Sequence, residues 1–154
     1  MALKNQVPNV YGVGLRNVGS YQVSGTPWVT GSSATHIDNN QIVRYRLPYV
    51  AKSFTVINIG TEDLRVHFQS GSSTTVNATD GTVGTGNAAS DVMAKFHYIT
   101  VGKNNGSVTF DVKCKEIYIS NHAGGSTSGY QIMAELTQIP TERMYELTGS
   151  GINV

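Results

Sequence analysis

The stretch Gln41-Ile-Val-Arg-Tyr-Arg-Leu47 decides the fold, because apolar and charged residues alternate along it. Val43, Tyr45 and Leu47 share one face of an extended chain, and the two arginines share the other. Successive side chains of a β-strand point to opposite faces, so the stretch predicts a strand buried on one side only. The same period returns in Tyr130-Gln-Ile-Met-Ala-Glu-Leu136, which predicts the last strand of the chain.

Between these two stretches, the sequence predicts two β-hairpins. Residues 53–59 and 63–68 flank a turn at residues 60–62, and residues 92–101 and 107–114 flank a glycine-bounded turn at residues 102–106. The apolar phase then slips by one residue, and a β-bulge near Lys115-Glu116 would restore burial of the following isoleucines. We therefore predict an all-β fold, an antiparallel β-sandwich, with a jelly roll as one arrangement of it.

The 154 residues suffice for one domain with its own hydrophobic core. Residues 1–36, rich in glycine with scattered apolar residues, predict an extended N-terminal arm that docks on the domain or on a neighbour. Residues 37–139 are the predicted β-sandwich domain. Pro140 stops the last strand, and residues 140–154 are a predicted C-terminal tail with one helical turn or two.

Residues 70–90 lack both periodicity and strong charge, and they offer mainly hydroxyls, amides and flexible backbone. Loops of this length in compact domains are usually functional or disordered. The segment is therefore a candidate for contact with a partner.

Composition excludes several classes of function. The formal net charge is +1, with 11 basic and 10 acidic residues, so no long-range field draws nucleic acid or an anionic membrane. The start of the chain lacks the apolar core of a signal peptide, and no later run is long enough to span a membrane. We expect neither nucleic acid nor membrane as a partner, and folding in the cytoplasm.

No pattern of residues predicts catalysis, a cofactor or a metal site. The four histidines form no close pair in sequence. His67 and His97 fall on outward-facing positions of their strands and could meet across a sheet, but solvated or interface histidines are the simpler interpretation. Cys114 is the only cysteine and falls on the core face of its strand, where a thiol behaves as a small hydrophobe. We expect a binding protein and not an enzyme.

The candidate partner-binding residues lie in the arm, on the first clear strand and in the tail. Aromatic and large apolar side chains in an extended arm are too apolar for a solvated segment. Paired arginines on one strand face can form bidentate contacts with carboxylates across an interface, although a solvated strand face is an equal alternative. The candidates are Tyr11, Leu15, Tyr21, Trp28, Arg44, Arg46, Met144 and Tyr145.

Three stretches carry a resemblance to known proteins. They are Asn9-Val-Tyr-Gly-Val-Gly-Leu-Arg-Asn-Val-Gly-Ser-Tyr-Gln-Val-Ser-Gly25 with Pro27-Trp-Val-Thr-Gly31 after it, Phe54-Thr-Val-Ile-Asn58 through Arg65-Val-His-Phe68, and Ile139-Pro-Thr-Glu-Arg-Met-Tyr-Glu-Leu-Thr-Gly-Ser-Gly151. Together they resemble small virion structural proteins of tailed marine bacteriophages, notably those that infect cyanobacteria.

The resemblance implies a capsid decoration or cement protein that is present in many copies. Its partners would be the major capsid protein and further copies of itself, with a homotrimer as one form by analogy. Its location would be the virion, after synthesis in the host cytoplasm. Two alternatives stay open: a tail, collar or fibre component, and a carbohydrate- or receptor-binding module in which Trp28 and the tyrosine-rich loops stack on sugar rings.

Overall fold

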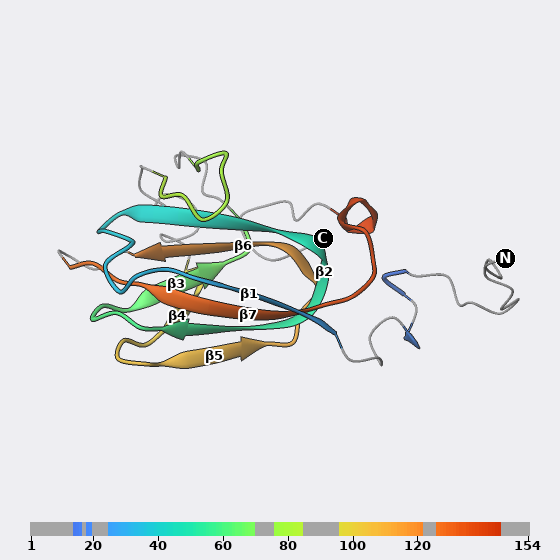
Figure 1. The fold of residues 1–154 in the computed structure, drawn as a ribbon, viewed down its shortest axis with the longest axis horizontal. Helices are drawn as coiled ribbons and strands as arrows, with labels where there is room; N and C mark the ends of the chain where they lie inside the picture. Colours follow the sequence, from blue (N-terminus) through green and yellow to red (C-terminus); the bar gives the residue numbers. More distant parts are fainter. Residues whose placement is uncertain are drawn as a thin grey trace, which may run out of the picture.

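The computed structural model describes residues 14–16, 18–19, 25–69, 76–84, 96–121 and 126–145. In these residues the chain forms seven antiparallel strands and one short 3₁₀ turn, η2 (Thr141–Arg143) (Figure 1). The strands are β1 (Thr26–Gly31), β2 (Gln41–Asn58), β3 (Leu64–His67), β4 (Ile99–Val101), β5 (Ser107–Phe110), β6 (Cys114–Asn121) and β7 (Tyr130–Leu136). The prediction of an all-β fold is confirmed.

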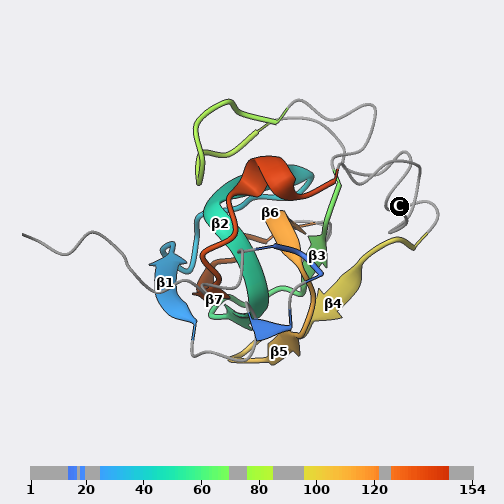
Figure 2. The same ribbon diagram turned by 90° about the vertical axis from the view of Figure 1, so that its right-hand side faces the viewer.

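The long strand β2 belongs to both layers of the sandwich. Its C-terminal half pairs with β7 on one side and β5 on the other, and β7 pairs in turn with β1. Its N-terminal half pairs with β6, which continues to β3 and β4. We call β1, β7, the C-terminal half of β2 and β5 the β7 layer, and the N-terminal half of β2 with β6, β3 and β4 the β6 layer. Figure 2 looks along the strands and shows the two layers. A jelly roll is not confirmed by this strand order.

The bend that carries β2 from one layer to the other lies at residues 47–50. Arg46 pairs with Glu116 and Ala51 pairs with Cys114, so β2 has four residues between these pairs where β6 has one. Pro48 lies in this gap and has no N–H to contribute to a ladder. The predicted irregularity near Lys115 is present, and the extra residues that cause it belong to β2.

Both predicted hairpins are wrong in their pairing. β3 follows β2 in sequence but pairs with β6 and β4, and β5 follows β4 but pairs with β2. The side chain of Asn58 explains part of this arrangement: its Nδ2 donates to the carbonyls of Glu62 and Val101, at 2.7 and 3.0 Å. This fully buried amide binds both turns at one end of the sandwich, so the chain crosses between layers there.

The core lies between the two layers and follows the predicted alternation. Every second residue of β7 from Tyr130 to Leu136 is buried, as the sequence indicated. The Tyr45 and Tyr130 hydroxyls form a buried hydrogen bond of 3.0 Å across the core. Cys114 is also buried, and burial raises the pKa of its thiol to about 12.

The sheet takes in part of the segment assigned to the arm. β1 pairs along its whole length with β7, and the ring of Trp28 packs edge-on against Tyr45 with a centroid distance of 5.7 Å. The prediction that apolar residues of this segment dock on the domain is confirmed for Trp28. A truncation that spares the sheet therefore has to end before Thr26.

Candidate interaction surfaces

The outer face of the β7 layer is open. Val29, Met133, Thr55 and Thr109 are cross-strand neighbours in one row that runs over all four strands of this layer. Val29 is 70% exposed and Met133 is 50% exposed. We call the row and its neighbours Pro27, Ile57, Ser107 and Gln131 the open face.

Charged groups lie at one end of the open face and not at its centre. Lys52 and Glu135 form an ion pair of 2.9 Å, which holds the pKa of the Glu135 carboxyl below its usual value. Lys52, Glu135 and Asp111 help to line a cavity of about 390 Å³ at this end. Exposed apolar side chains among uncharged polar ones, with charges at the rim, are typical of the central part of a protein interface.

The strand edges are poor places for a partner to add a strand. Ser32 N–H donates to the Tyr130 carbonyl of β7. In an antiparallel pair every second residue directs its backbone groups to the partner strand, so the backbone of Trp28 faces β7 and that of Pro27 faces outward. Proline removes one donor from the free edge of β1, and the edge strands β5 and β4 have only four and three residues. A partner therefore gains more from the open face than from these edges.

The outer face of the β6 layer, by contrast, is covered. Ile42 and Tyr118 point away from the main core, yet they are 0% and 6% exposed because Val76 and Tyr98 pack over them. His67 is stacked on Tyr118 with a ring-centroid distance of 5.7 Å. These residues form a second, smaller core on the outer face of the β6 layer, where the alternation of the strands predicts solvent-exposed side chains.

The prediction of a solvated or interface His67 is therefore wrong. Its Nδ1–H donates to the Gln69 carbonyl at 2.7 Å, which leaves Nε2 to accept from the Ser120 hydroxyl at 3.1 Å. Burial lowers the pKa of His67 to about 4, so the ring is neutral near pH 7. Both side chains are 1% exposed, and the pair acts as a satisfied buried hydrogen bond with no access for a substrate.

The two arginines of β2 bind the chain itself. Arg46 Nε donates to both carboxylate oxygens of Asp80, at 3.0 and 3.2 Å, and this contact raises the pKa of Arg46. Arg44 Nη2 donates to the carbonyls of Asn77 and Ala78, each at 3.3 Å. An arginine–carboxylate contact therefore exists, but a single N–H is shared between the two oxygens, and the carboxylate comes from residues 76–84 of the same chain and not from a partner.

The candidates at the two ends of the chain come together at the bend of β2. Leu15 packs against a buried cluster of Val50, Ile139 and Met144, and its carbonyl accepts a hydrogen bond of 2.7 Å from Lys113 Nζ. Tyr145 is 43% exposed beside this cluster. Tyr11 and Tyr21 lie outside the described residues, as do most of the arm and tail.

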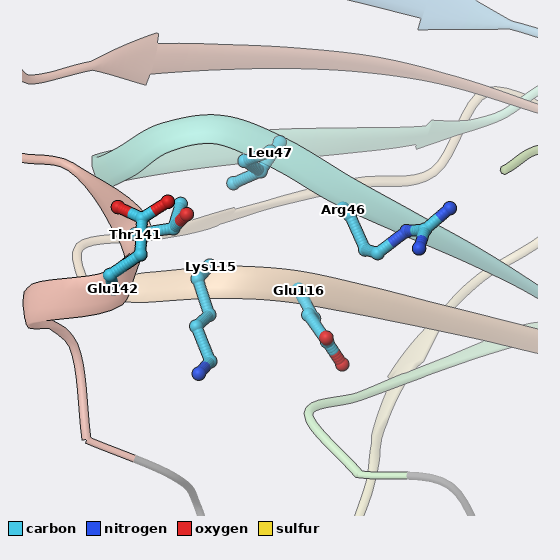
Figure 3. Close-up of a pocket in the computed structure, with 6 residues that line it drawn as sticks. All are labelled: Arg46, Leu47, Lys115, Glu116, Thr141 and Glu142. Carbon is cyan, nitrogen blue, oxygen red and sulfur yellow. The ribbon is translucent and has the colours of Figure 1, made fainter.

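A cavity of about 270 Å³ lies beside the bend, next to β6 and η2. Its lining residues are Arg46, Leu47, Lys115, Glu116, Thr141 and Glu142, and Figure 3 shows Arg46 and Lys115 pointing in different directions. Glu116 accepts a hydrogen bond of 2.6 Å from the Tyr118 hydroxyl. Charges of both signs line this cavity, and two of the charged groups, Arg46 and Glu116, already bind other residues of the chain. The lining therefore does not indicate which kind of ligand the cavity would bind.

Within the described part of the chain, no three His, Cys, Asp or Glu side chains are grouped closely enough to hold a metal ion. None of the helices in that part is long and apolar enough to cross a membrane. What the described surfaces define is an all-β sandwich with one open and one covered outer face.

Comparison with known proteins adds no relative. No protein-family model matches the chain, and neither a curated protein nor a solved structure matches it.

Sequence reasoning missed Val29, Met133 and Asp80. The first two are ordinary strand residues whose exposure depends on which sheet face stays uncovered, and no local pattern carries that information. Asp80 is the single carboxylate among residues 70–90, opposite two arginines that were themselves candidates for carboxylate contacts. That complementary charge was the one available signal.

Proposed function

We propose that the protein is a non-enzymatic structural protein of a tailed-bacteriophage particle, a decoration or cement protein that binds the shell of major capsid protein. The observation that carries the proposal is the open face of the β7 layer, where Val29 and Met133 are exposed in the middle of a sheet. The resemblance of the three sequence stretches to virion proteins supplies the kind of particle.

The open face suits a partner that is itself a large surface. An exposed sheet face can bury surface against a partner without pairing a further strand to the sheet. The short or proline-containing edge strands favour this face-to-face docking. A repeated shell also adds avidity, so each contact needs only moderate strength.

The packing of Trp28 does not support the carbohydrate-binding alternative. Trp28 packs against Tyr45 on the core side of β1, so its ring is not a stacking platform for sugars. The tail, collar or fibre alternative differs from the proposal in copy number and not in fold.

The first test is therefore the copy number of this protein relative to the major capsid protein in purified particles, by quantitative mass spectrometry. A ratio near one to one, or a simple fraction such as one third, supports shell decoration. A dozen copies or fewer indicates the tail or portal, and absence from particles refutes a virion role.

A second test concerns the docking surface. Met133→Asp places a charge at the centre of the open face, and we expect it to remove the protein from particles while the isolated protein keeps its fold. Tyr49→Asp is the matched control, because Tyr49 is exposed to a similar extent, 46% against 50%, but lies at the bend of β2 and not on the open face. Equal incorporation of both variants would contradict docking through the open face, even if the copy number supports decoration.

A further inference from the structure

Residues 76–84, which we call the strap, lie along the free edge of the N-terminal half of β2 (Figures 1 and 2). Ile42 and Gly84 exchange backbone hydrogen bonds of 3.4 and 2.7 Å, and Gly81 N–H donates to the Arg44 carbonyl at 2.9 Å. The strap therefore occupies the position of a neighbouring strand, although only one residue of it forms a ladder bridge.

At the third of these edge residues a side chain replaces the backbone. The Arg46 N–H donates to Asp80 Oδ1 at 3.3 Å, where a paired strand would present a carbonyl. The same carboxylate binds the Arg46 guanidinium, and Arg44 Nε lies 3.8 Å from Oδ1. That nitrogen is buried and has no hydrogen-bond partner, so Asp80 is the group that compensates its charge.

The two arginines also bind the backbone of the strap: Arg44 Nη2 donates to the Asn77 and Ala78 carbonyls, and Arg46 Nη2 donates to the Ala78 carbonyl at 2.9 Å. The other contacts of the strap are at its ends and at its turn. Val76 packs on the small outer core and Val83 on the main core, whereas residues 78–80 are exposed. Gly81 has a φ of +73°, and a Cβ there would lie 2.8 Å from the Tyr45 hydroxyl. Other residue types are strained at such a φ, so the strap needs glycine at this point.

We propose that the strap is a releasable cover on a strand edge, latched at its centre by Asp80. The carboxylate is 34% exposed and the Arg46 side chain 52%, so dissolved salt reaches the ion pair. Opening of the latch leaves Ile42, Arg44 and Arg46 with backbone groups directed to solvent. It thereby converts the covered edge of β2 into an unpaired strand edge, the feature that strands of other chains can pair with.

Hydrogen exchange of single amides, measured by NMR, tests the latch. We expect Asp80→Asn to speed exchange at Ile42 and Arg46 about fivefold, because an exposed ion pair of this kind has a modest effect. The amides of Val43 and Tyr45 face β6 by alternation and should keep their wild-type rates. Asp38→Asn, at another exposed aspartate, is the matched control.

Salt provides the second measurement. Raising the salt concentration from about 0.05 M to 1 M shortens the screening length from more than 10 Å to about 3 Å, and should speed exchange at Ile42 and Arg46 in the wild type. It should have little effect in Asp80→Asn, which has already lost the charge.

A third variant opens the strap without a change of charge. Gly81→Ala introduces a strained φ and a close contact with Tyr45, so it should raise exchange at the same two amides more than Asp80→Asn does. Gly102→Ala is its control, because a Cβ at Gly102 meets nothing within 4 Å.

The proposal is overturned if Ile42 and Arg46 exchange at wild-type rates in Asp80→Asn, or if Val43 and Tyr45 accelerate with them. The first result would mean that Asp80 is no latch. The second would mean that the strap and the layer open together and that the strap is not a separate cover.

Discussion

The two outer faces of the sandwich come from the same alternating strand pattern and end in opposite environments. On the β6 layer, Ile42 and Tyr118 are 0% and 6% exposed, whereas on the β7 layer Val29 and Met133 are 70% and 50% exposed. The strands themselves do not cause this difference. The strap and Tyr98 cover one face, and no described residue seals the other.

The comparison teaches that strand alternation assigns a side chain to a face but not to a solvent environment. Covered positions should respond to substitution as core positions do, and open positions should respond weakly in stability while remaining available to a partner. The predictions below test that division, in order of the expected effect on the free energy of unfolding.

The largest effect is expected at Ile42. Ile42→Ala removes a fully buried side chain from the covered face and should lower the free energy of unfolding by about 3 kcal/mol, because it leaves a cavity under the strap. Val29→Ala on the open face should change it by less than about 0.5 kcal/mol. Urea denaturation measures both, and similar costs at the two sites would break the comparison.

The covered face should also make stability depend on pH. In the folded state the buried His67 ring has a pKa of about 4, whereas in the unfolded chain its pKa is near 6.5. The unfolded state therefore takes up the proton first as the pH falls, and stability is lost between pH 6.5 and about 4. The difference corresponds to about 3 kcal/mol at most.

The contribution of His67 is isolated by comparison with His67→Gln. Denaturation curves at pH 7, 6, 5 and 4 should show a steeper loss of stability in the wild type than in the variant, because carboxylates titrate in both. Parallel pH profiles would mean that His67 is solvated and that the face is not closed.

Much of the fold was predictable from sequence because it rests on local alternation. The strand at residue 130, the burial of Tyr45 and Cys114 and the irregularity near Lys115 all follow from period-two patterns and their interruption. The choice of partner strands was not predictable in this way. Asn58 joins two turns through its hydrogen bonds to Glu62 and to Val101, which lies 43 residues further along the chain, and no local pattern indicates such a contact.

Some of the candidate site residues were predictable from the sequence, but their contact partners were not. Trp28 and the two arginines were identified as residues that make specific contacts, and they do, but within their own chain. Chemical type indicates what a side chain can bind, whereas the partner depends on which segment folds over it. Asp80 reaches Arg46 across 34 residues, so the contact belongs to the tertiary fold.

The next prediction compares buried and exposed hydroxyls, starting with Ser120. Ser120→Ala removes the donor to His67 Nε2 and leaves that buried nitrogen without its partner, at a cost of about 1–2 kcal/mol. The substitution also changes the environment of His67, so its effect should be measured at pH 7, where the ring is neutral. A loss below about 0.5 kcal/mol would indicate that water reaches the ring.

The smallest effect is expected at Thr109 on the open face. Its hydroxyl forms a hydrogen bond of 2.8 Å with Thr55 Oγ1, which is shorter than the 3.1 Å contact between Ser120 and His67. Distance alone would rank the threonine pair as the stronger one. Because this pair lies on the open face, water can replace the lost partner, so Thr109→Ala should cost about 0.5 kcal/mol or less. Calorimetric unfolding of Thr109→Ala and Ser120→Ala under one set of conditions decides between distance and burial, and a larger loss for Thr109→Ala would show that the open face is not solvated.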